Sequence, residues 1–268
     1  MPIVTVRDIA MHYETEGSGD PLILIPYLSA DHACYAFQTP EYSKHFTCVA
    51  VDLRGAGTTD KPAGPYSTEQ LADDVAGLME VLDIDRAHVA GMSFGAAAGM
   101  WLAAKCPERV ASLSLHSAWA KTDRFAAVVV KSWQVMARAL GSVPDTLIEG
   151  IFPWCFTPEM YSEKPEFVAA LEDFVRSRPP QPVDAFLQQS DAVLAHDAEA
   201  QLGRIVAPTQ ITYGRCDLVT STRFAPALTD GIKDAELLVF EHLSHAGLHE
   251  DADGFNQATL EFLTRQKL

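Results

Sequence analysis

Short apolar runs with little polar alternation constrain the fold of this chain more than any other feature. The runs at 22–25 and 46–51 read LILI and FTCVAV, and further strand candidates follow at 87–90 and 111–115. A strand without alternation is buried on both faces, as in a parallel sheet covered by helices. Strand–helix–strand repetition at this interval predicts a doubly wound, mostly parallel α/β sheet.

Helices are predicted between these strands. Ser67 and Gln70 form a capping box that opens a helix. The apolar residues that share one face of this helix are Leu71, Val75, Leu78, Met79 and Leu82. A second helix, rich in Ala and Leu, runs to about Lys105 and ends there because a residue that precedes proline disfavours helical geometry.

Strand candidates also lie near both ends of the chain. Residues 3–6 and 9–14 are predicted to form a hairpin, and further strands are predicted at 209–213 and 236–240. A terminal helix then brings together Phe255, Ala258, Phe262 and Leu263.

The pattern of predicted strands is interrupted in the middle of the chain. Between about 120 and 204 the periodicity is helical, and aromatic residues cluster there. These residues are Phe125, Trp133, Phe152, Trp154, Phe156 and Tyr161. We therefore predict an α/β core at 1–119 and 205–268, with a helical cap, or lid, inserted at 120–204.

The charge balance limits the partners that the chain can bind. Of 268 residues, 20 are Lys or Arg and 36 are Asp or Glu, so the formal net charge is −16. Nucleic-acid binding relies on cationic side chains that neutralise phosphates, and anionic membrane surfaces attract basic segments. We therefore expect no nucleic-acid partner and no membrane association. The apolar stretches also fall short of the roughly 18 residues that indicate a membrane span.

Cysteine usage and the amino terminus favour a cytoplasmic protein. We separately expect a monomer or a homodimer. The five cysteines are scattered and lack CxxC spacing, which argues against a disulfide framework or a thiolate zinc site. The first residues, MPIVTVRD, contain neither the basic nor the apolar region of a secretory signal.

A G-x-S-x-G sequence at 91–95 places Ser93 between a predicted strand and a predicted helix. In this context a tight turn exposes the serine hydroxyl above the sheet, and the glycines have no Cβ to clash in that turn. The free N–H groups at a helix start also favour developing negative charge. Ser93 is therefore the candidate nucleophile.

A serine hydroxyl needs a base, and the base needs an orienting acid, in the chain order serine, acid, histidine. Asp217 follows the strand predicted at 209–213 and is the candidate acid. Asp123, shortly after the strand at 111–115, is the reserve candidate.

Three histidines compete for the role of base. His242 stands close to the end of a strand, and His249 abuts the start of a helix, so both are interpreted as surface or supporting groups. His245 lies in the middle of the loop and is the candidate base. The remaining histidines are interpreted as structural: His12, His32, His45, His88, His116 and His196. No H-x-x-x-H pair lies on a helix beside a carboxylate, so no catalytic metal is expected.

These residues resemble the α/β-hydrolase superfamily, in its single-domain group with a helical cap. The similarity covers nearly the whole chain and implies a central sheet of about eight strands. The stretch at 52–62 resembles the family's D-x-R-G-x-G-x-S-x-x-P motif. That motif is mostly structural: Arg54 is expected to anchor loops by hydrogen bonds, and Asp60 and Lys61 to form a solvated rim.

One segment departs from the family pattern. The family usually carries His-Gly after its third strand, whereas this chain has Pro26-Tyr27. By resemblance, the backbone N–H groups of Leu28 and Phe94 form the oxyanion hole, and Pro26 has no N–H to donate. Tyr27 either aims its hydroxyl into the pocket or only packs. Enol-lactonases similar to 3-oxoadipate enol-lactonase also depart from His-Gly here.

The resemblance implies a serine hydrolase that cleaves small-molecule esters and needs no cofactor. A carboxylesterase is the favoured prediction. A lactonase of the 3-oxoadipate enol-lactonase type uses the same chemistry and is the alternative. Proteins of this fold also serve as small-molecule sensors with little turnover, and hydroxynitrile lyases reuse the triad, so both classes stay open. The serine at position 93 excludes the dehalogenases and epoxide hydrolases that carry aspartate there.

Aromatic residues are the candidate substrate contacts, because small-molecule pockets are mostly apolar and aromatic. They are Tyr27, Trp119, Trp133 and Trp154. A dicarboxylate lactone would require a cationic clamp. The cap offers Lys121, Arg124, Lys131 and Arg138, each of which is expected on the surface instead.

Overall fold

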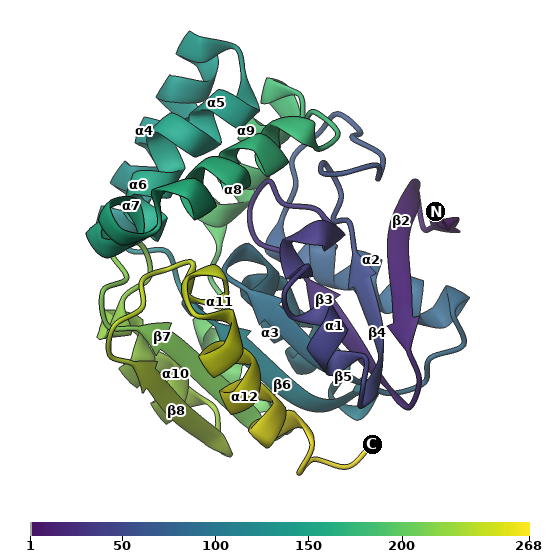
Figure 1. The fold of residues 1–268 in the computed structure, drawn as a ribbon. Coiled ribbons are helices and arrows are strands. Elements are labelled where there is room, and N and C mark those ends of the chain that lie inside the picture. The colour runs from purple at the N-terminus through teal and green to yellow at the C-terminus, as the bar shows by residue number, and fades with distance from the viewer. Residues whose placement is uncertain (1) are drawn as a thin grey trace.

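The computed structural model describes residues 2–268, and its centre is an eight-stranded sheet in the order β1-β2-β4-β3-β5-β6-β7-β8 (Figure 1). The strands are β1 (Ile3–Val6), β2 (Ile9–Gly17), β3 (Asp20–Ile25), β4 (Phe46–Val51), β5 (Ala87–Met92), β6 (Val110–His116), β7 (Thr209–Gly214) and β8 (Ala235–Phe240). β2 pairs antiparallel with β1 and β4, and the remaining pairs are parallel. The predicted fold class is confirmed, including the hairpin at the start of the chain.

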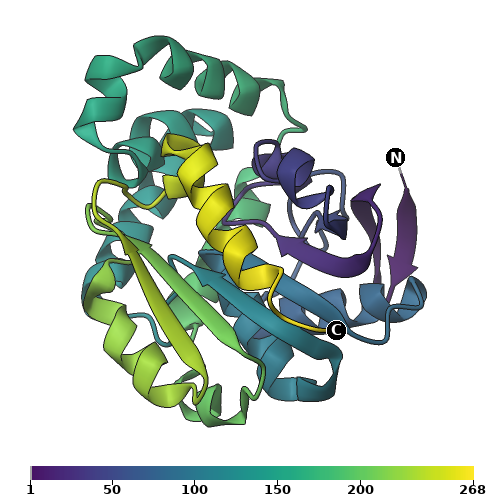
Figure 2. The same ribbon diagram turned by 60° about the horizontal axis from the view of Figure 1, so that its bottom comes forward.

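Both faces of the sheet are covered, which explains why its central strands lack alternation. Ile23 and Ile25 on β3 belong to a core shared with α2 (Thr68–Val81), α3 (Phe94–Lys105) and α10 (Ala225–Gly231). The neighbouring residues Leu22 and Leu24 belong to a second core on the other face, shared with α1 (Thr39–Tyr42) and α12 (Ala252–Leu263). Figure 2 shows α12, in yellow, lying across that second face. Alternate side chains therefore enter different cores, and both must be apolar.

Helix caps follow the sequence signals in part. The Ser67 side chain accepts the Gln70 backbone N–H over 3.0 Å at the start of α2, as predicted. The Gln70 side-chain oxygen is buried without a hydrogen-bond partner among the described residues, so the reciprocal half of the capping box is missing. At its other end α3 stops at Lys105, ahead of Pro107.

Between β6 and β7 the chain forms helices that gather beyond one end of the sheet (Figure 1). They are α4 (Arg124–Leu140), α5 (Val143–Thr146), α6 (Phe152–Cys155), α7 (Pro158–Glu163), α8 (Pro165–Ser177) and α9 (Val183–Ala195), with one π-helical turn at Leu147–Ile151. We call them the cap helices. The segment begins and ends at one place, because a β-bridge joins Lys121 to Asp197 and the Ala198 N–H donates to the Ala120 carbonyl over 2.8 Å.

No helix within residues 2–268 combines the length and the apolar character that crossing a membrane requires.

Candidate active site

The turn between β5 and α3 holds Ser93 in a strained backbone conformation. Its φ is 51° and its ψ is −111°, a region that side chains other than glycine rarely adopt. The flanking glycines permit this turn because the chain is crowded on both sides. A Cβ on Gly91 would lie 2.4 Å from the Gly95 carbonyl oxygen, and a Cβ on Gly95 would lie 2.1 Å from the Ile25 carbonyl oxygen. The G-x-S-x-G pattern is thus a packing requirement that presents Ser93 at the carboxyl edge of the sheet.

Ser93, His245 and Asp217 form a continuous hydrogen-bonded row. His245 Nε2 lies 3.1 Å from Ser93 Oγ, and His245 Nδ1 lies 2.9 Å from Asp217 Oδ2. All three residues are buried. The reserve acid Asp123 stays apart: it caps α4 and pairs with Arg223 over 2.8 Å. With Nδ1–H directed at a carboxylate, the lone pair of His245 Nε2 faces the Ser93 hydroxyl, which is the arrangement that a general base requires.

Asp217 is held ionised by its surroundings. Burial raises the pKa of its carboxyl. Attraction to the His245 ring, and hydrogen bonds from that ring and from two backbone amides, lower the pKa by a larger amount, so the pKa lies below its ordinary value. The amides are those of Val219 and Thr220, at 2.7 and 2.8 Å from Oδ1. A carboxylate that accepts several N–H groups remains charged and keeps a fixed orientation.

Thr220 supports the same row and was not singled out from the sequence. Its Oγ1 donates to the Ser117 carbonyl over 2.8 Å and lies 3.1 Å from both Asp217 Oδ2 and His245 Nδ1. The available signal was the D-x-x-T spacing, since an aspartate commonly accepts backbone N–H groups two and three residues onward.

The two candidate oxyanion-hole amides belong to segments that adjoin Ser93. The Phe94 N–H lies in the first turn of α3, where amides lack a partner within the helix. Leu28 follows β3, and its N–H makes no hydrogen bond within the described residues. Both Leu28 and Ser93 line the same cavity. Close contact between Gly95 and the carbonyl oxygens of Ile25 and Pro26 brings the two segments together.

A cavity of about 150 Å³ opens above Ser93, between the sheet edge and the cap helices. Its lining is mostly apolar and includes Val130, Leu147, Ile151, Phe152, Phe156 and Val219. Of the candidate substrate contacts, Tyr27, Trp119 and Trp133 belong to the lining. Trp154 is not part of it and packs, half-buried, against the core. The cap cations considered above are exposed and outside the lining: Lys121, Arg124, Lys131 and Arg138.

The fold and this site can be compared with those of known proteins. The family model described as the alpha/beta hydrolase fold matches residues 16–252. The chain belongs to this family. As a hydrolase of this fold, it has relatives that span nearly its full length.

The 3-oxoadipate enol-lactonase 2 of Acinetobacter baylyi is 28% identical over 265 residues, covering 98% of this chain and 96% of the relative. The provisionally named carbamate hydrolase RutD of Azorhizobium caulinodans is 27% identical over 267 residues, covering 98% of each chain. Among solved structures, the enol-lactonase of Burkholderia xenovorans LB400 is 28% identical, with a TM-score of 0.90 and coverage of 98% of this chain and 100% of that one.

A second polar pair lies in the hydrolase cavity. The Tyr27 hydroxyl lies 3.1 Å from His249 Nε2, and the buried His249 Nδ1 has no hydrogen-bond partner within residues 2–268. Burial lowers the pKa of His249 to about 4, so its ring is neutral near pH 7. His242, by contrast, is exposed. Of the two histidines set aside in favour of His245, only His249 reaches the cavity.

Glu250 fastens the loop of His245 to the cap helices, and sequence reasoning missed it as well. Its carboxylate accepts the Ser244 N–H over 2.5 Å and the Thr157 N–H over 2.7 Å. The side chain is buried, so both amides depend on it. A glutamate beside three histidines carries no sequence signal of this contact.

Arg54, in the stretch at 52–62, has the anchoring role expected of it. Its guanidinium is almost fully buried and donates to Asp74 over 2.8 Å and to Asp8 over 2.6 Å. Asp60 is exposed, as expected of a solvated rim, although one of its carboxylate oxygens accepts the Ala10 N–H over 2.8 Å.

Proposed function

We propose that this hydrolase cleaves small carboxylic esters through an acyl-enzyme formed on Ser93. The observation that carries the proposal is the row Ser93 Oγ, His245 Nε2, His245 Nδ1 and Asp217 Oδ2, with successive contacts of 3.1 and 2.9 Å. A nucleophile, a base and an orienting acid at these distances are what acyl transfer requires.

In the proposed reaction, Ser93 Oγ attacks the ester carbonyl carbon while His245 accepts the serine proton. The N–H groups of Leu28 and Phe94 stabilise the tetrahedral oxyanion, and loss of one such donor typically costs about 2.7–4 kcal/mol of barrier. His245 then gives the proton to the departing alcohol. Water activated by the same ring releases the acid and restores Ser93.

The cavity lining supports an apolar substrate. Asp31 and Arg178 are the Asp, Glu, Lys and Arg side chains of the described lining, and they pair with each other over 2.8 Å. No unpaired cation of the described lining is therefore available to hold a free carboxylate on the substrate. Esters with an alkyl or aryl acyl group fit this lining better than a dicarboxylate does.

Lactone hydrolysis is a second candidate, favoured by the names of the similar proteins. Two of them, in Acinetobacter baylyi and Burkholderia xenovorans, are enol-lactonases. The chemistry is the same except that the leaving alcohol stays attached to the acyl group. The pairing of Arg178 with Asp31 argues for a lactone without a free carboxylate.

The proposal is tested by turnover of p-nitrophenyl acetate, butyrate and octanoate, together with a neutral lactone and a carboxylated enol-lactone. The wild type is compared with the test variant Ser93→Ala and with the matched control Ser132→Ala. Ser132 is exposed on α4, so its variant should retain full activity. We expect butyrate turnover to be lost in Ser93→Ala.

Covalent capture separates an enzyme from a sensor. A fluorophosphonate should add one phosphonyl group to Ser93 of the wild type, with loss of fluoride, and none to Ser93→Ala. Wild-type turnover near the background rate, with binding of these compounds intact, would instead identify a sensor. Unchanged activity in Ser93→Ala would refute the mechanism.

A further inference from the structure

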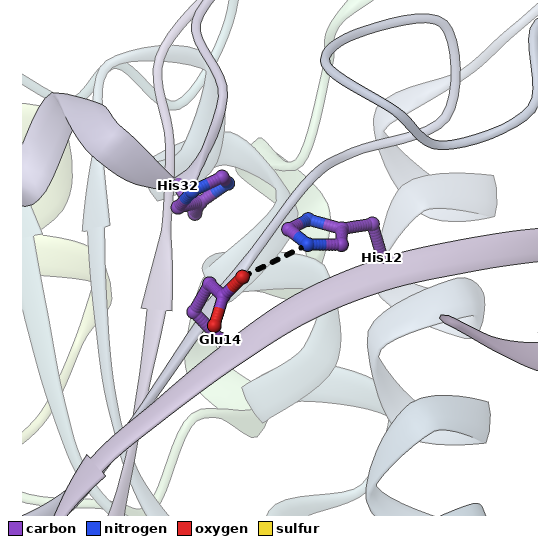
Figure 3. Close-up of side chains that lie close together, drawn as sticks. All are labelled: His12, Glu14 and His32. Carbon is purple, nitrogen blue, oxygen red and sulfur yellow. Dashed lines mark hydrogen bonds and ion pairs between the residues drawn. The ribbon is translucent and has the colours of Figure 1, made fainter. Parts of the chain in front are cut away.

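Two histidines and two carboxylates cluster at a place that the proposed reaction does not use. His12 and Glu14 lie two residues apart on β2, so their side chains share one face of the strand. His32 begins the short 3₁₀ helix His32–Tyr35 that follows β3. Figure 3 shows these three side chains facing one another. One ligand atom of each lies within 4.8 Å of the others.

The ring of His12 lies between two carboxylates. Its Nδ1 lies 3.0 Å from Asp52 Oδ2, and its Nε2 lies 3.1 Å from Glu14 Oε1. The ring of His12 and the carboxylate of Asp52 are fully buried. An imidazole with one N–H can donate at only one of these contacts, and at the other its lone pair faces a carboxylate oxygen. Either a metal ion or a second ring proton at that contact removes the repulsion, and a metal ion is the one that His32 can also bind.

Asp52 orients both imidazole rings. Its Oδ1 lies 2.7 Å from His32 Nδ1, and its Oδ2 also accepts the Thr58 N–H over 2.9 Å. With Nδ1–H of each ring directed at Asp52, both Nε2 atoms keep their lone pairs. A carboxylate that fixes histidines in this way is the usual outer partner of a metal-bound imidazole.

We propose that Zn²⁺ binds between His12, Glu14 and His32, with Asp52 as the carboxylate behind the two rings. The donors, two imidazoles and one carboxylate, are ones that zinc binds at about 2.0–2.2 Å. The 3.1 Å between His12 Nε2 and Glu14 Oε1 suits two ligands of a single ion. Glu14 and His32 are partly exposed, with side-chain exposures of 40% and 18%, so the ion can enter from solvent and keep water as a further ligand.

The ion would be structural, because the cluster contains none of Ser93, His245 and Asp217. It would tie β2 to the segment after β3, which also carries Leu28 and Asp31 of the cavity lining. Hard cations such as Mg²⁺ prefer oxygen-only sites and should not replace zinc here.

The test is calorimetric titration of the full, EDTA-treated and desalted chain with ZnCl₂ at pH 7.5, combined with thermal unfolding. We expect one zinc ion per chain, and a melting temperature raised by roughly 5–10 °C when free zinc is about 100 times the Kd. MgCl₂ at the same concentrations should give neither effect.

Variants locate the ion. Glu14→Gln and His32→Ala should each weaken zinc binding at least tenfold, whereas His242→Ala, which removes an exposed histidine elsewhere, should not. Glu14 is partly exposed, so Glu14→Gln should fold normally and keeps the test valid should His32→Ala unfold. Absence of zinc binding by the wild type, or zinc binding by Glu14→Gln and His32→Ala as tight as that of the wild type, would overturn the proposal.

Discussion

Glu250 and Ser244 are joined by a 2.5 Å hydrogen bond from the Ser244 backbone N–H to the buried carboxylate, one residue before His245. The other oxygen of the same carboxylate accepts the Thr157 N–H at the cap helices. The loop that carries the base is thus held by a side chain that also holds the cap helices. Any disturbance of Glu250 should therefore reach both stability and catalysis.

Glu250→Ala should lower the free energy of unfolding by about 2–5 kcal/mol, because two buried N–H groups lose a charged acceptor. We also expect kcat to fall, since the loop of His245 is released. Urea unfolding and p-nitrophenyl butyrate turnover measure both effects. The matched control is Glu261→Ala, whose exposed carboxylate accepts the Gln257 side chain at 3.2 Å and holds no backbone N–H within residues 2–268. Equal behaviour of the two variants would contradict the role given to Glu250.

Asp217→Asn should reduce kcat by about 10⁴ with little change in KM, because an amide no longer fixes the His245 tautomer or stabilises its charged form. Asp123→Asn is the control, since asparagine also caps α4 and this residue is remote from the row. Steady-state kinetics of both variants decide the matter. A larger loss in Asp123→Asn would transfer the acid role to that residue.

Thr220→Val should lower kcat by about 3- to 10-fold, the equivalent of one modest hydrogen bond. The reason is that Thr220 Oγ1 lies 3.1 Å from both Asp217 Oδ2 and His245 Nδ1. In the Asp217→Asn background the same change should have a smaller effect, because the two residues act on one ring. Effects that simply multiply in the double variant would show that Thr220 acts independently.

Tyr27→Phe should change substrate preference. Tyr27 and His249 form a polar pair in a mostly apolar lining, so we expect them to bind a hydroxyl or keto group on the acyl chain. The variant should lose about 3- to 10-fold in kcat/KM for such esters and less than twofold for plain alkanoates. Competition between butyrate and hydroxybutyrate esters measures this ratio. An equal loss for both would assign Tyr27 to packing alone.

The chain should lose stability in mild acid through its buried histidines. Burial lowers the pKa of His196 to about 4, whereas the unfolded side chain titrates near 6.5. Between these values the unfolded state binds more protons, so the free energy of unfolding falls as pH falls, by up to about 3 kcal/mol at pH 4. His196→Gln should flatten this dependence between pH 7 and 4.5 in urea unfolding. An identical slope in the variant would exclude the histidine as a cause.

Local patterns predicted the sheet and the strand–turn–helix that carries Ser93, because each depends on neighbouring residues. Unalternating strands follow from burial on two faces, and the position of Ser93 follows from glycines that the turn itself requires. Asp217 and His245 could be chosen because strand ends fix where each loop emerges.

Contacts between distant segments had no comparable signal. Thr220, Glu250 and the pairing of Tyr27 with His249 arise only when loops from several strands meet. Trp154 illustrates the same limit, since it lies in a four-residue helix, Phe152–Cys155, too short for periodicity to show which side faces the cavity.

The bridge between Lys121 and Asp197 brings the two chain ends of the cap segment together at one point. The cap helices make further contacts with the core, among them those of Thr157 with Glu250 and of Arg178 with Asp31. A segment of another shape can therefore join the same two strand ends, but Glu250 would lose the Thr157 N–H that it binds together with the loop of His245. A new cap must supply a donor for that carboxylate, so substrate specificity and the position of the histidine are coupled.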